Sequence, residues 1–92
     1  NQFLVYDNYP NPFNPITTVR YDLPNLRDIK IKIIDIMGRT IKSVENNNMT
    51  PGRKSFVWDG TNDFGNTVST GIYFFQINAG NDSRNIKMLF LK

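Results

Sequence analysis

The sequence contains neither cysteine nor histidine. Without thiols the chain forms no disulfide bond and offers no thiolate to a metal or to a nucleophilic mechanism. Without imidazole it also lacks the most common general base and the nitrogen ligand of most zinc sites. We therefore expect a protein that is not an enzyme and that carries no cofactor.

The chain also has no dense block of charge and no long apolar run. Eleven basic residues and eight acidic ones give a net charge of +3, and the basic residues are spread from Arg20 to Lys92. Nucleic-acid binding proteins usually concentrate their basic residues, so we expect no nucleic-acid partner. No apolar run approaches the roughly 18 residues of a membrane span, so we expect no transmembrane segment.

The length of 92 residues corresponds to one domain. Because the chain begins at Asn1 rather than at Met and shows no signal-like segment, we expect it to be part of a longer polypeptide. Residues 1–7 are interpreted as the end of a linker or a short first strand, and residues 8–92 as the domain itself.

Short apolar alternations recur along the chain, separated by turn signals about every ten residues, and helical periodicity is nearly absent. This pattern predicts an all-β protein, an immunoglobulin-like antiparallel β-sandwich of about seven strands without substantial helix. The expected strands are residues 3–6, 16–23, 28–36, 40–44, 53–58, 72–79 and 85–91.

The strand over residues 28–36 gives the strongest signal. Ile29, Ile31 and Ile33 share one face, but the alternation slips at Ile34. The slip predicts either a β-bulge or a strand that is covered on both faces. Gly38 is expected to take a positive φ in the tight turn that follows, and residues 45–52 are expected to form a loop.

Residues 8–15 hold three of the five prolines. Proline fixes its own φ and favours extended geometry in the preceding residue, so a stiff segment close to polyproline II is expected. Its aromatic side chains, Tyr9 and Phe13, could dock on the sandwich or be recognised by a partner. We expect both to dock.

The loop over residues 59–69 contains candidate residues for two functions, catalysis and calcium binding. Asp59 and Asp63 could act as a carboxylate pair, and with Thr61 they resemble the start of a calcium loop. However, the glycine falls one place late, and Thr70 stands where a bidentate glutamate would be needed. Asx turns in an ordinary β-arch are the favoured alternative, and calcium binding stays open.

Three aromatic residues, Trp58, Tyr73 and Phe75, could form a carbohydrate-binding platform. Because they alternate with polar or small neighbours, as core residues do, we expect them to be buried.

The apolar strand near the end of the chain offers another binding mode. At a sheet edge its unpaired backbone groups could accept a partner strand, and an ordinary last strand is an equal alternative.

Residues 9–15 followed by residues 17–24 resemble the opening of the type A C-terminal sorting domains of the type IX secretion system. Residues 34–39, 51–52, 58–61, 65, 69–74 and 87–92 resemble successive blocks of the same family. The ordered set covers residues 8–92, with small departures at Ile34 and Met37. A related immunoglobulin-like module of the flagellar hook-capping protein shares the middle blocks, but we do not expect it to carry both the proline block and the lysine-rich terminal strand.

This resemblance implies a non-catalytic signal that takes a folded cargo across the outer membrane of a Bacteroidetes-type Gram-negative bacterium, through the periplasm, to release or attachment at the cell surface. The implied partners are the outer-membrane translocon, its shuttle proteins, a sortase-like surface peptidase and an N-terminal cargo domain in the same chain. Recognition by the export machinery is expected at the last six residues: Lys87, Met88, Leu89, Phe90, Leu91 and Lys92. The other family-motif residues are expected to be mainly structural: Pro10, Asn11, Pro12, Gly38, Trp58, Asp59, Gly60, Gly71 and Tyr73.

Two other functions remain open from the sequence. One is an accessory carbohydrate-binding module attached to a secreted enzyme, and the other is a structural immunoglobulin-like spacer or cap. The sorting hypothesis predicts that loss of residues 85–92 leaves the cargo in the periplasm, whereas a spacer would not affect the location of its cargo.

Overall fold

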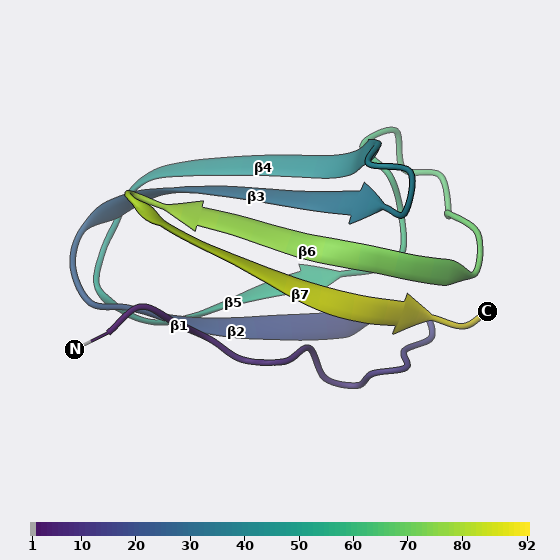
Figure 1. The fold of residues 1–92 in the computed structure, drawn as a ribbon, viewed down its shortest axis with the longest axis horizontal. Coiled ribbons are helices and arrows are strands. Elements are labelled where there is room, and N and C mark those ends of the chain that lie inside the picture. Colours follow the sequence, from purple (N-terminus) through teal and green to yellow (C-terminus); the bar gives the residue numbers. More distant parts are fainter. Residues whose placement is uncertain (1) are drawn as a thin grey trace.

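The computed structural model describes residues 2–92, and only Asn1, the start of the expected segment 1–7, lies outside it. Seven strands form two antiparallel sheets that face each other (Figure 1). The smaller sheet has the order β1 (Leu4–Val5), β2 (Thr17–Leu23), β5 (Gly52–Trp58). The larger has the order β4 (Thr40–Met49), β3 (Arg27–Asp35), β6 (Gly71–Ala79), β7 (Asp82–Phe90). The all-β, immunoglobulin-like sandwich is thereby confirmed, and within residues 2–92 no helix could span a membrane.

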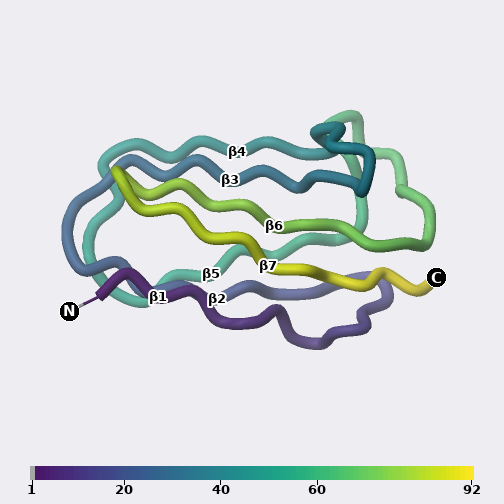
Figure 2. The backbone as a smooth tube through the Cα atoms, in the orientation of Figure 1, coloured from purple at the N-terminus to yellow at the C-terminus, as the bar shows by residue number. Residues whose placement is uncertain are grey.

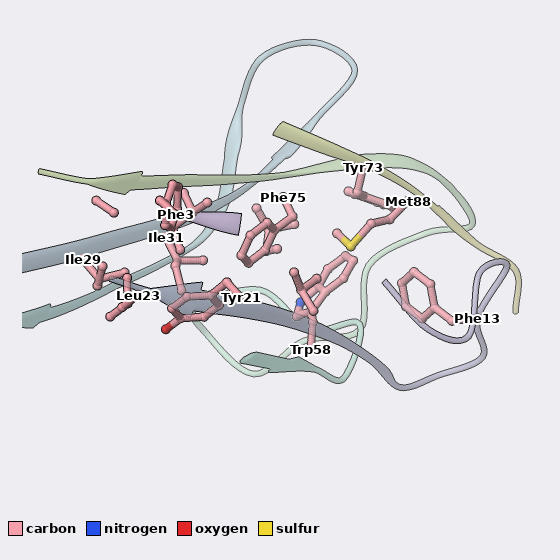
Figure 3. Packing of buried hydrophobic residues seen from close by; sticks show 14 of the residues in the cluster. Phe3, Phe13, Tyr21, Leu23, Ile29, Ile31, Trp58, Tyr73, Phe75 and Met88 are labelled. Atoms are coloured by element: carbon pink, nitrogen blue, oxygen red, sulfur yellow. The ribbon is translucent and has the colours of Figure 1, made fainter. Parts of the chain in front are cut away.

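The core lies between the two sheets and consists of alternate residues from the facing strands (Figure 3). In β3 the three isoleucines that share a face in the sequence are all buried, and the lysines between them face outward. Burying such side chains stabilises the fold by about 25 cal/mol per Å² of apolar surface. The buried apolar side chains are Phe3, Phe13, Val19, Tyr21, Leu23, Ile29, Ile31, Ile33, Trp58, Tyr73, Phe75, Ile77, Ala79, Met88 and Phe90.

The β3–β4 hairpin has the predicted bulge and turn. The register between the strands shifts between Ile33 and Ile34, and Gly38 has a φ of 84°. The Asp35 carboxylate accepts hydrogen bonds from the backbone N–H groups of Met37 and Arg39, both at 2.9 Å. These bonds fix the turn and lower the pKa of Asp35, with the Arg39 backbone as the main cause.

Strand β4 is longer than the sequence predicts, and the loop expected over residues 45–52 is reduced to Thr50 and Pro51. Pairing with β3 continues to Met49, which lies opposite Arg27. The three consecutive asparagines at 46–48 favour turns. Asn46 pairs with Ile29 of β3, and the register then shifts before Met49 pairs with Arg27, so the strand continues through an irregularity. Asn48 adopts a φ of 57° and donates its backbone N–H to the Asp28 carboxylate at 2.8 Å.

The proline segment, residues 8–15, is not the expected extended rod. It bends at residues 10–12 and 14–15, and its three peptide bonds that precede proline are cis, a geometry open to such bonds. The Thr17 hydroxyl holds the first bend by donating to the Pro10 carbonyl at 2.8 Å. The docking prediction is confirmed for Phe13, which is 2% exposed, and wrong for Tyr9, which is 75% exposed. Figure 2 shows the segment running beneath β2 toward the end of the sandwich where the C-terminus lies.

Candidate functional site

Strand β7 forms one edge of the larger sheet and pairs with β6 along its whole length. Two of the six terminal residues belong to the core, because Met88 and Phe90 are almost fully buried. Leu89 is half-buried, and Lys87, Leu91 and Lys92 are exposed. Only the exposed residues and part of Leu89 are therefore accessible to a partner; recognition through them stays a prediction.

The proline segment covers the outer edge of β7 near the C-terminus. The Phe13 N–H donates to the Leu89 carbonyl and the Leu91 N–H donates to the Phe13 carbonyl, both at 3.0 Å. The Leu89 N–H donates to the Asn11 side-chain oxygen, also at 3.0 Å. These three bonds satisfy the outward backbone groups of Leu89 and the amide of Leu91, which an edge strand otherwise leaves open. Strand addition at this point would require the proline segment to leave.

Aromatic packing joins the proline segment to the terminal strand. The ring of Phe13 stacks on that of Phe90, with 5.0 Å between centroids and 15° between planes. It also contacts the Trp58 ring at 5.5 Å, and Trp58 in turn meets Tyr73 edge-on at 5.2 Å. Figure 3 shows Phe13 at the end of the core, beyond Trp58. The two ends of the chain therefore share one aromatic cluster.

Gly60 is needed where the loop after β5 passes this cluster. Its φ is +76°, and a Cβ there would lie 3.0 Å from the Phe90 ring and 3.4 Å from the Pro15 carbonyl oxygen. Any larger residue would combine an unfavourable backbone conformation with a steric clash. The Trp58 indole N–H donates to the Thr61 carbonyl at 2.9 Å and holds the loop in place.

The carboxylates of the 59–69 loop are engaged by protein donors. Asp59 accepts hydrogen bonds from the Thr61 hydroxyl and the Thr61 N–H, and the hydroxyl bond is the main cause that lowers the pKa of Asp59. Asp63 accepts from the Ser43 N–H at 3.3 Å, and the Asn62 side chain closes an Asx turn. Across residues 2–92 no cluster of three or more acidic, histidine or cysteine side chains could hold a metal ion. We expect a calcium titration to leave the Tm unchanged.

The aromatic residues considered for carbohydrate binding lie in the core. Trp58, Tyr73 and Phe75 are all buried, as their alternation predicts. The Tyr73 hydroxyl donates to the Ser69 carbonyl at 2.6 Å and fixes the chain before β6. These three side chains form no exposed platform for a sugar. They therefore do not support the carbohydrate-binding alternative.

The remaining motif positions lie where the backbone turns or changes element. The Pro10 carbonyl accepts the Thr17 bond, Pro12 is exposed at the end of the first bend, and Gly71 begins β6. Sequence reasoning missed a group of apolar side chains on the outward face of the larger sheet. Ile34 and Phe74 lie directly opposite each other there. The slip at Ile33–Ile34 was the available signal, since it puts Ile34 on the face opposite to the core.

The model of the FlgD Ig-like domain family matches residues 16–83. The match therefore leaves out the proline segment and residues 84–92, which are the parts joined at the end of the sandwich. A sequence comparison with curated proteins gives no match.

Several solved structures share the fold. Latent dimeric PorU from Porphyromonas gingivalis superposes with a TM-score of 0.70 at 20% identity over 99% of this chain. PorZ from the same organism, described as an essential bacterial surface component of the type IX secretion system, gives 0.66 at 24% identity over 98%. FlgD from Xanthomonas campestris gives 0.65 at 18% identity over 95%. The chain spans 10% of the PorU chain, 11% of the PorZ chain and 64% of the FlgD chain.

Proposed function

The chain belongs to the FlgD Ig-like domain family, and we propose that it serves as a non-catalytic C-terminal signal domain for the type IX secretion system. In this role it directs a cargo protein through the periplasm and across the outer membrane of a Gram-negative bacterium. The cargo is then released or attached at the cell surface.

One observation carries the proposal. Residues 8–15 and 84–92, which the FlgD family model leaves unmatched, contain the first and last blocks of the resemblance to sorting domains and are joined in the fold. The Phe13–Phe90 stack and the hydrogen bonds between Phe13, Leu89 and Leu91 make them one unit. Similarity in sequence and contact in space thus coincide in the parts of the chain that the family model does not match.

The similarity to PorU and PorZ is consistent with this function. The two superpositions cover 99% and 98% of the chain, so they include both joined segments. At 20% and 24% identity they establish a common fold. A type IX component with this fold supports the assignment of the chain to the same system.

In the proposed mechanism the sandwich is a rigid carrier for a recognition surface. The signal needs no chemistry of its own, because the translocon and its shuttle proteins bind the folded domain and a sortase-like peptidase removes it afterwards. Lys87, Leu91 and Lys92 project from the last strand and its end, where such partners can reach them.

The test fuses this chain to the C-terminus of a fluorescent reporter in a bacterium that has a type IX system. We expect surface or extracellular reporter with the chain and periplasmic reporter without it. Deleting residues 85–92 is a poor test of recognition, because it removes the buried Met88 and Phe90 together with the surface. The sharper variant replaces Lys87, Leu91 and Lys92 by Ser, with the exposed Leu26→Ser as a matched control.

A structural cap or spacer is the second candidate function. The family match and the fold of Xanthomonas FlgD, a protein described as capping the flagellar hook, favour it. It predicts that the reporter stays in the same compartment with and without this chain, so the same fusion distinguishes the two functions.

A further inference from the structure

The outward face of the larger sheet is apolar near the C-terminal end of the sandwich. Ile34 of β3 lies opposite Phe74 of β6, and Ile72 of β6 lies opposite Leu89 of β7. All four side chains are only half-buried. The molecule has two layers, and no part of residues 2–92 covers this face (Figure 1). An uncovered apolar group of this kind marks an interaction surface more often than a scattered exposed side chain does.

The β3–β4 turn extends the same surface. Ile36 is 70% exposed and Met37 is 76% exposed. On one side of the turn is a hollow of about 370 Å³ lined in part by Ile34, Ile36 and Phe74. On the other side is a hollow of about 250 Å³ lined in part by Met37 and Ile72. The turn is therefore an apolar ridge between two hollows, and partner side chains can pack against it from either side.

The positive charges on this face are only partly neutralised by ion pairs. Lys30 pairs with Glu45 at 3.4 Å, and Arg39 pairs with Asp35 at 2.8 Å. Two other lysines take part in no ion pair within residues 2–92: Lys32, opposite Gln76, and Lys87, opposite Phe74. Two unneutralised ammonium groups thus flank the apolar group, and they favour a partner that presents carboxylates.

We propose that this surface, called here the apolar face and defined as Ile34, Ile36, Met37, Ile72, Phe74 and Leu89 with Lys32 and Lys87 at its rim, binds an acidic and apolar segment of the export machinery. The proposal rests on the proposed function, and it extends the recognition surface from the terminal strand to β3, β6 and the β3–β4 turn. Apolar side chains of the partner enter the two hollows, and its carboxylates reach Lys32 and Lys87. A second copy of this chain fits poorly, because packing two such faces together brings like charges close.

The test measures export of the reporter fusion for two variants of the apolar face. The first, Ile36→Ser with Met37→Ser, changes only turn side chains that are mostly exposed, so the domain keeps its Tm. The second, Lys32→Glu with Lys87→Glu, reverses the rim charge. Matched controls on the outward face of the other sheet are Val57→Ser and Arg20→Glu, both at exposed positions.

We expect each apolar-face variant to lower surface reporter by about tenfold, as for loss of a binding hot spot, while the controls and all melting curves match the wild type. Normal export of both variants would overturn the proposal and leave the signal function standing. Failure of the wild-type fusion to be exported would instead refute the signal function and, with it, this inference. Analytical sedimentation tests whether a second copy of the chain binds this face instead. A wild-type dimer that dissociates in the Met37→Ser variant would assign the face to a second copy and overturn the proposed partner.

Discussion

At the scale of single residues, Phe13 and Tyr9 belong to the same short segment but differ in burial. Phe13 fills the space between Phe90 and Trp58, whereas Tyr9 points into solvent. We predict that Phe13→Ala lowers the free energy of unfolding by about 3–5 kcal/mol, because it leaves a cavity in the aromatic cluster. Denaturant unfolding measures the change. Tyr9→Ala is the matched control and should stay within about 0.5 kcal/mol of the wild type; equal losses would contradict the packing.

Gly60 and Gly65 form a second matched pair. Both have positive φ, at +76° and +84°, but only the Cβ position of Gly60 is crowded, by the Phe90 ring. Alanine at either site carries a backbone penalty of about 1–2 kcal/mol. We predict that Gly60→Ala costs about 1–3 kcal/mol more than Gly65→Ala, since Phe90 must also shift. Indistinguishable thermal unfolding of the two variants would mean that the loop does not pack on the terminal strand.

Asp35 makes the stability of the β3–β4 turn depend on pH. Hydrogen bonds from the Arg39 backbone, its guanidinium and the Met37 backbone lower the pKa of Asp35 in the fold. A carboxylate with a lowered pKa stabilises the fold above its ordinary pKa, and this stabilisation is lost as the pH falls through the folded value. We predict that wild type has a higher Tm than Asp35→Asn at pH 7, and that the difference shrinks below about pH 4. A difference that stays constant from pH 7 to pH 2 would exclude this origin.

At the scale of elements, the proline segment acts as a short extra strand at the edge of β7. Alternation along the edge points the amides of Lys87, Leu89 and Leu91 away from β6. Those of Leu89 and Leu91 find acceptors in the proline segment. Within the described part of the chain no hydrogen bond is formed by the Lys87 amide on that side.

This arrangement predicts a pattern of hydrogen exchange. The amides of Leu89 and Leu91 should exchange slowly and that of Lys87 quickly, because an amide exchanges only when its hydrogen bond opens. Asn11→Ala should accelerate Leu89 and leave Leu91 protected, since Leu91 donates to the Phe13 backbone instead. Equal and fast exchange of all three amides in the wild type would show that the proline segment does not cover the edge.

The strands were largely predictable because their signal is local. A period of two assigned the buried face of β3 correctly and placed Tyr73 and Phe75 of β6 in the core, and one slip in the β3 period located the bulge beside Ile34. The length of β4 was not predictable, because its asparagines favour turns. Asn48 in fact takes a φ of 57° at a register shift, and pairing with β3 on both sides of that shift carries the strand to Met49. The bends of the proline segment were not predictable either, since they depend on the contact of Thr17 with Pro10 and on contacts with β7, which lies at the other end of the chain.

At the scale of the whole molecule, only part of the candidate site could be predicted from the sequence. Its terminal strand was named from the resemblance to the sorting domains, but the burial of Met88 and Phe90 depends on the facing sheet. The apolar face could not be found in advance, because β3, β6 and β7 are brought together only by the sheet order. Recognition by the fold as a unit is therefore expected, rather than recognition of a linear peptide.

The most direct test of the central claim is the location of a folded fluorescent reporter that carries residues 1–92 at its C-terminus. The measurement compares the surface and periplasmic fractions in a bacterium with an intact type IX system and in a strain without its translocon. We predict surface or extracellular reporter in the first strain and periplasmic reporter in the second. Reporter that remains in the periplasm of both strains, while the domain is folded, would contradict the claim.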